Sequence, residues 1–192
     1  MKYFKIICLA FVLTACGSED GLNESIFIED LDNLGLPIYS ELGYNTFGFY
    51  YNSIPVTSST WRDNPLQIKT EAGNSVFTFK GNSPTRANKL KLQMKDVVIS
   101  APEDLRDFAG QRIDLSTDDV VVQLGNNVDT LTVNSGSFEF SSIRVMTLDG
   151  QYEGIIASGT FELDGQLYSE NISITNGRFD IRIDKYLIEV VE

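Results

Sequence analysis

Apolar and polar residues alternate with a period of two through most of this chain, from Asn45 to its end. Because successive side chains of a β-strand point to opposite faces, this alternation predicts strands that each bury one face. The clearest example is 88–99, where Leu90, Leu92 and Met94 alternate with lysines and a glutamine. The same pattern predicts further strands at 46–51, 75–80, 111–115, 119–124, 128–133, 137–147, 152–163, 167–175, 179–183 and 186–191.

Short turn sequences separate the predicted strands. Asn, Asp and Gly tolerate the positive φ that tight hairpins require. Turns are therefore predicted at 126–127, 134–136, 149–150, 164–165 and 176–177. Asp96 breaks the alternation of its strand and indicates a bulge. The stretch from Gly136 to Glu192 is predicted to form a meander of long antiparallel strands, and only Pro102 to Gly110 has the pattern of a helical turn.

The predicted elements leave two architectures open. No segment with helical periodicity is long enough to cover a sheet, so the strands must pack against another sheet or close into a barrel. Residues 45–192 are thus predicted to form a single all-β domain. We expect an antiparallel β-sandwich with meander hairpins, and a lipocalin-like closed β-barrel is the alternative.

The first sixteen residues have the features of an export signal. Two lysines precede an apolar run that is too short to span a bilayer of about 30 Å as a helix. The run ends in Leu13-Thr14-Ala15-Cys16, which resembles the bacterial lipobox. The resemblance implies a type II lipoprotein signal peptide at 1–15 and a lipidated Cys16 at the start of the mature protein. The alternative is an ordinary secretory signal with an incidental cysteine.

The net charge and the residues that follow Cys16 favour a protein that is anchored to a membrane and has no nucleic-acid partner. Loss of Lys2 and Lys5 with the signal would move the formal net charge from −12 to −14. A charge of this sign repels nucleic-acid phosphates. Glu19 and Asp20 are similar to the acidic run that follows the lipidated cysteine of surface-displayed Bacteroidota lipoproteins. We expect outer-membrane anchoring through the lipid, with surface exposure favoured over the periplasmic leaflet.

Residues 16–44 differ in composition from the rest and are predicted to form a lipidated tether and a lead-in segment that docks on the domain. Between Glu24 and Leu34 the spacing of Ile28, Leu31 and Leu34 predicts one or two helical turns. Acidic residues cluster at 29–32, but they lack the spacing and glycine of an EF-hand loop, so we interpret them as a solvated surface.

The residue inventory excludes most catalytic chemistry. The chain has no histidine, and both of its cysteines lie in the first sixteen residues. Histidine-dependent nucleophile systems, zinc sites and proton shuttles are therefore excluded, and no cofactor or metal is expected. Glu139, Glu162 and Asp180 alternate with apolar residues, which predicts that all three face solvent on the sheet. The chain is not expected to be an enzyme.

Aromatic residues crowd the start of the predicted domain. Phe47, Phe49 and Tyr51 alternate as core residues should, whereas Tyr50 and Trp61 fall outside that pattern. Exposed rings can stack on the apolar faces of sugars. Tyr50 and Trp61 are therefore the candidate ligand-binding residues, with a glycan or an envelope protein as the expected partner.

Three short stretches carry a family resemblance. Gly43 to Asn52 contains an N-T-F-G strand opening, while Ser158 to Leu163 and Ile174 to Asp180 resemble G-T-F-E-F and I-T-x-G-R-F-D endings. Together they resemble a group of uncharacterised Bacteroidota lipoproteins of the DUF6252-like kind. The resemblance implies an all-β exported lipoprotein and supplies no activity.

These observations predict a lipid-anchored cell-envelope protein that serves as a non-catalytic binding or structural accessory module. One alternative is a lipocalin-like carrier of a small apolar ligand, because a barrel interior can enclose one. A carboxylate-only glycan hydrolase is the less favoured alternative, since it needs two acids that converge in one cleft. The residues leave the ligand and the oligomeric state open.

Overall fold

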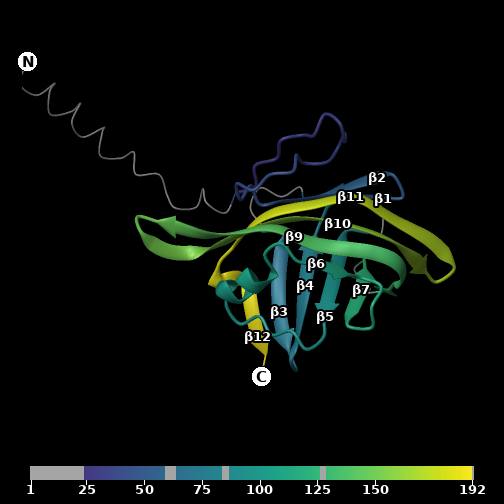
Figure 1. The fold of residues 1–192 in the computed structure, drawn as a ribbon. Coiled ribbons are helices and arrows are strands. Elements are labelled where there is room, and N and C mark those ends of the chain that lie inside the picture. The colour runs from purple at the N-terminus through teal and green to yellow at the C-terminus, as the bar shows by residue number, and fades with distance from the viewer. Residues whose placement is uncertain (1–23, 59–63, 84–86, 126–128, 192) are drawn as a thin grey trace, which may run out of the picture.

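The computed structural model describes residues 24–58, 64–83, 87–125 and 129–191, which form two six-stranded sheets (Figure 1). The first sheet has the order β2 (Ile54–Thr57), β1 (Thr46–Tyr51), β11 (Glu170–Ile183), β10 (Gln151–Leu167), β9 (Thr132–Leu148), β6 (Arg112–Asp114). The second has the order β12 (Ile188–Val191), β3 (Leu66–Glu71), β4 (Asn74–Lys80), β5 (Lys89–Met94), β7 (Val120–Leu124), β8 (Asp129–Thr130). The predicted all-β fold is confirmed.

Phenylalanine rings fill the space between the sheets. Phe79 of β4 lies 4.9 Å from Phe47 of β1 and 5.8 Å from Phe138 of β9, measured between ring centroids. Phe138 in turn stacks on Phe179 of β11 at 5.0 Å and on Phe161 of β10 at 5.8 Å. All five rings are buried. The sandwich prediction is confirmed. The closed-barrel alternative is wrong, because the described strands pair within two separate sheets.

The long strands β9, β10 and β11 form the predicted meander, but three predicted turns are absent from it. The strands continue through 134–136, 164–165 and 176–177. The glycines there serve close packing instead, because a Cβ on Gly136, Gly165 or Gly177 would lie 2.5–2.7 Å from a carbonyl oxygen of the neighbouring strand. The predicted turn at Asp149 and Gly150 is confirmed, with φ of 49° and 78°, and the one predicted at 126–127 lies outside the described residues.

At the chain's connections one further prediction is confirmed and two are modified. The helical turn is the 3-10 helix η2 (Pro102–Phe108), as expected. Asp96, with φ of 57°, lies in a turn beyond the end of β5, so it is not a bulge within a strand. After β11 the 3-10 helix η3 (Lys185–Leu187) leads to β12, which leaves the meander and pairs with β3 in parallel. No described helix is long and apolar enough to cross a membrane.

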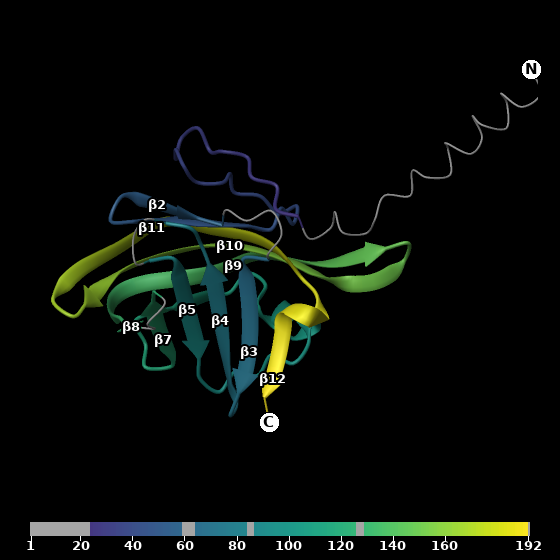
Figure 2. The ribbon, with the colours of Figure 1, turned by 180° about the vertical axis from the view of Figure 1, so that it is seen from behind.

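The lead-in segment, described over residues 24–44, lies along the outer face of β1 and β11 (Figures 1 and 2, purple). It is an irregular hairpin in which Glu29 bridges Pro37 and Ile38 N donates to Ile28 O at 2.8 Å. The predicted helical turns are therefore wrong. Further backbone bonds join Asp30 N to Leu36 O across the hairpin and Ile26 N to the Tyr44 carbonyl.

Candidate functional site

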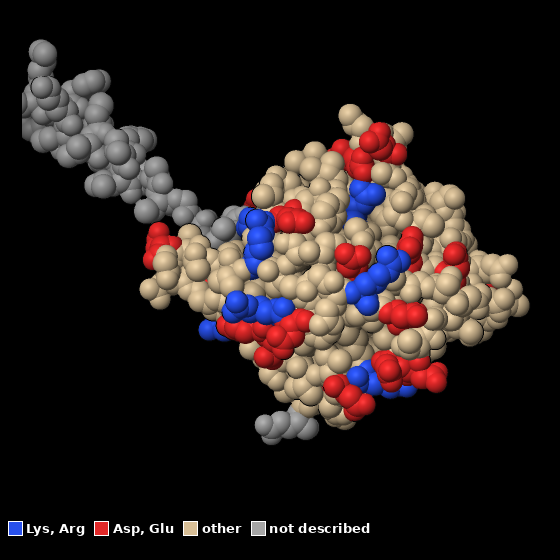
Figure 3. Space-filling view, in the orientation of Figure 1, with Lys and Arg blue, Asp and Glu red and all other residues tan. Residues whose placement is uncertain are grey.

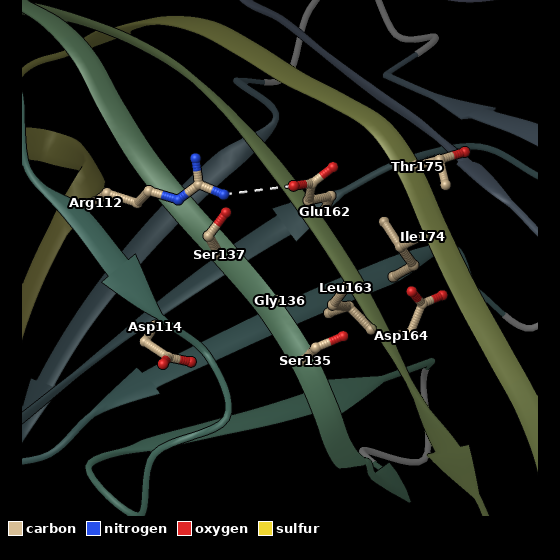
Figure 4. A pocket seen from close by; sticks show the side chains of 10 residues that line it. All are labelled: Arg112, Asp114, Ser135, Gly136, Ser137, Glu162, Leu163, Asp164, Ile174 and Thr175. Carbon is tan, nitrogen blue, oxygen red and sulfur yellow. Dashed lines mark hydrogen bonds and ion pairs between the residues drawn. The ribbon is translucent and has the colours of Figure 1, made fainter.

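A polar groove crosses the outer face of the first sheet, on the side away from the ring core. Its larger part has a volume of 570 Å³ and is lined by the ten residues drawn in Figure 4. A second part of 330 Å³ continues from it, and the two parts share Arg112, Ser137 and Glu162. We call both parts together the outer groove.

Strand alternation places the polar side chains in the outer groove. On β10, Glu162 and Asp164 point outward, while Phe161 and Leu163 between and beside them are buried. On β9, Ser137 pairs with Glu162 across the ladder. The short strand β6 then adds Arg112 at the edge of the sheet. The groove is therefore a direct consequence of the period-two pattern on three adjacent strands.

Carboxylates dominate the larger part of the groove. Arg112 Nη2 lies 3.5 Å from Glu162 Oε1, and the two side chains are 63% and 66% exposed (Figure 4). Asp114 and Asp164 line the same part, and neither forms an ion pair with another of the described residues. The Ser116 hydroxyl and backbone N–H both donate to Asp114 and lower the pKa of its carboxyl. The groove thus offers an acidic surface with one accessible guanidinium.

The lead-in segment forms one wall of the smaller part. Arg178 of β11 donates to Asp30 Oδ2 at 2.5 Å and to Pro37 O at 3.2 Å. Asn33 Nδ2 donates to the same Asp30 oxygen at 2.8 Å. These hydrogen bonds, from Asn33 first and then from Arg178, hold the pKa of Asp30 at about 2. Tyr39 also lines this part, with 39% of its surface exposed.

Asp30 is expected to stabilise the docked segment in a pH-dependent way. Because its pKa is lowered from 3.8 to about 2, its contribution is complete above about pH 4 and is lost as the pH falls through 2. We expect Asp30→Asn to lower the free energy of unfolding at pH 7 by about 1–2 kcal/mol. Urea unfolding at pH 7 and pH 2 measures this. Equal losses at the two pH values would contradict the assignment.

Asp180 corrects the expectation that all three acids face solvent. It points to the outer side of β11, but the lead-in segment covers it and leaves it 1% exposed. Its carboxylate accepts backbone N–H bonds from Leu42, Gly43 and Tyr44 at 3.2, 2.8 and 3.0 Å. Ser158 Oγ donates a fourth bond at 2.9 Å. Asp180 is therefore a buried anchor for the lead-in segment, whereas Glu139 and Glu162 lie in the outer groove as surface acids.

Tyr50, one of the two predicted ligand-binding residues, does not line the outer groove. Tyr50 is half-buried, and its hydroxyl donates to Leu34 O at 2.9 Å beneath the lead-in segment. Trp61 and Cys16 lie outside the described residues. Sequence reasoning missed Arg112 and Asp114, because the three-residue strand β6 gives no hint of its neighbour β9. Among the described residues, no group of three or more acidic side chains is arranged to hold a metal ion.

Comparisons with known proteins leave the chain without an assigned relative. No family model, no curated protein and no solved structure matches it.

Proposed function

We propose that this chain is a lipid-anchored, non-catalytic binding module of the cell envelope, and that the outer groove binds a neutral polyhydroxylated ligand such as a glycan strand. The observation that carries this is the groove's composition of carboxylates, hydroxyls, amides and two guanidinium groups over two adjoining hollows. Sugar hydroxyls both donate and accept hydrogen bonds, so carboxylates and an arginine can pair with neighbouring hydroxyls. The half-exposed ring of Tyr39 adds an apolar edge.

The excess of carboxylates in the outer groove favours a neutral ligand over an anionic one. Asp114, Glu139, Glu162 and Asp164 outnumber the accessible Arg112, while Arg178 is already engaged by Asp30. An anionic polymer would be repelled by this set of carboxylates. A neutral glycan meets no such penalty and gains charge-assisted hydrogen bonds from the acids.

The hydrolase alternative has one observation in its favour, because Glu139 and Glu162 line the same hollow. A glycosidase needs one carboxyl group held as an acid in a setting that excludes water. Glu162 is 66% exposed and lies beside Arg112, which does not supply such a setting. The apolar-carrier alternative is less favoured still, since phenylalanine rings occupy the interior between the sheets.

Groove substitutions are expected to weaken glycan binding without affecting the fold. We expect Glu162→Gln to lower the affinity for a neutral oligosaccharide about tenfold, because hydrogen bonds to a charged group contribute about 1.5–3 kcal/mol. Isothermal titration against a panel of neutral and anionic oligosaccharides measures this. Glu170→Gln, an exposed acid at the β10–β11 turn, is the matched control and should bind as the wild type does.

Two outcomes would argue against this proposal. If no neutral oligosaccharide binds the wild-type chain, the groove has a different ligand. If reducing ends accumulate and Glu139→Gln abolishes their release, the chain is a hydrolase. The lipid anchor is tested separately, because Cys16→Ser should release the protein from the membrane fraction.

A further inference from the structure

The lead-in segment leaves many large apolar side chains exposed, although Leu36 is buried and Asp30 and Asn33 bind the domain. Among the described residues, seven of fifteen exposed large apolar side chains belong to this short segment: Ile26, Phe27, Ile28, Leu31, Leu34, Tyr39 and Leu42. Leu31 is 83% exposed and Leu34 is 65% exposed at the end of the hairpin. In Figure 3 the hairpin projects from the body, with uncharged and acidic atoms side by side. Concentrations of exposed apolar side chains of this kind mark interaction surfaces.

Polar contacts hold this segment in place. Besides the ion pair between Asp30 and Arg178, Glu29 Oε1 accepts from Gly35 N at 2.8 Å. Asn176 Nδ2 of β11 donates to Asn33 Oδ1 at 2.7 Å. The hairpin is thus held by bonds of Asp30 and Asn33 to β11 and by the Glu29–Gly35 bond within it. Leu31 and Leu34 are held outward by a structured backbone.

The apolar surface continues from the hairpin onto the sheet. Gly35 packs so closely on the ring of Pro55 that a Cβ there would lie 3.1 Å away. The adjacent Ile54, at the start of β2, is 42% exposed. Leu31, Leu34 and Ile54 therefore belong to one end of the molecule, which we call the apolar end.

The position of the apolar end in the chain points to what covers it. Glu24 is eight positions after Cys16, and an extended chain spans at most about 3.5 Å per residue. If Cys16 is acylated as proposed above, Glu24 stays within roughly 28 Å of the bilayer. Of the residues that the structure describes, those of the hairpin then lie nearest to the anchor along the chain.

We propose that the apolar end contacts the bilayer, with Leu31 and Leu34 inserted among zwitterionic headgroups. The headgroup class follows from charge, because Glu24, Asp32 and other acids of the same segment would be repelled by anionic lipids. This inference rests on the proposed lipid anchor. It adds that the domain lies against the membrane on a defined side, with the wall of the outer groove next to the lipid surface.

Site-specific labelling tests the contact. In the proposed mature chain Cys16 would be acylated and Cys8 removed, so a new cysteine would take up a thiol-reactive, polarity-sensitive dye at one position. Leu31→Cys is compared with Tyr186→Cys, since both native side chains are 83% exposed and Tyr186 lies on η3, away from the hairpin. In phosphatidylcholine vesicles the dye at 31 should be at least twofold brighter than the dye at 186. It should resist iodide and be quenched by lipid-borne nitroxide.

Different results would contradict the bilayer contact and the lipid anchor. The proposal is overturned if the dyes at 31 and 186 are equally accessible to iodide in an acylated chain. Shielding at 31 in native membranes but not in protein-free vesicles also overturns it, because a protein then covers the apolar end. The mass of the N-terminal fragment reports acylation independently, so an unmodified Cys16 refutes the anchor itself. Added phosphatidylglycerol should weaken the shielding at 31, and salt should restore it.

Discussion

Asp180→Asn is expected to lower the free energy of unfolding by about 3 kcal/mol. The native carboxylate accepts three backbone N–H bonds from Leu42, Gly43 and Tyr44 and one hydroxyl bond from Ser158. An amide has one acceptor oxygen, and its NH₂ group would face donors in a buried site. Urea unfolding measures the change, and thermal unfolding should show a shift on the order of 10 °C.

The control for this change is Asp164→Asn on the neighbouring strand β10, where the side chain is exposed. It should alter stability by less than about 0.5 kcal/mol. Hydrogen exchange adds a local test, because the amides of residues 42–44 should lose protection in Asp180→Asn before the strands do. Equal stability of the two variants would refute the anchoring role of Asp180.

Gly159→Ala is expected to destabilise the domain by about 4 kcal/mol or more. Gly159 lies on β10 and faces the core, where a Cβ would stand 1.9 Å from Glu139 O of β9. It would also stand 2.6 Å from the Phe179 ring, which is stacked on Phe138. The carbonyl cannot move without disturbing the β9–β10 ladder, which shifts register at this point. Equilibrium unfolding in urea measures the loss.

Gly73→Ala separates this clash from the general effect of replacing glycine. Gly73 lies between β3 and β4, has φ of 79° and has no atom within 4 Å of an added Cβ. Its replacement should cost only about 1–2 kcal/mol, from the left-handed backbone. If Gly159→Ala lowers the free energy of unfolding no more than Gly73→Ala does, the close approach of β9 is not the reason that position 159 requires glycine.

The alternation of side chains was sufficient to predict the core. Phe47, Phe49, Leu90 and Leu92 are all buried where a period of two places them. The turn predictions at several glycines were wrong, because glycine occurs both in turns and where two strands pack closely. Gly150 has a positive φ in a turn, whereas Gly165 packs against Thr132 O. Choosing between these roles requires the position of the neighbouring strand.

The outer groove was only partly accessible to sequence reasoning. The outward direction of Glu139 and Glu162 follows from their strands, and both were recognised as surface acids. Arg112 and Asp114 join them only because β6 pairs with the edge of β9. A three-residue strand has too little periodicity to predict its partner.

Local pattern and long-range contact thus decide different properties of this protein. The period of two is a property of neighbouring residues, so it predicts an all-β fold and the inward or outward direction of most side chains, while the choice between a sandwich and a barrel depends on which strands pair. Whether an outward residue meets water depends on segments far away in the chain. The position of Asp180 on β11 directs its side chain outward, yet the side chain is buried. Residues 42–44, which precede it by more than 130 positions in the sequence, cover it. The same docking turns Leu31 and Leu34 to the surface, since Asp30 and Asn33 bind β11 instead.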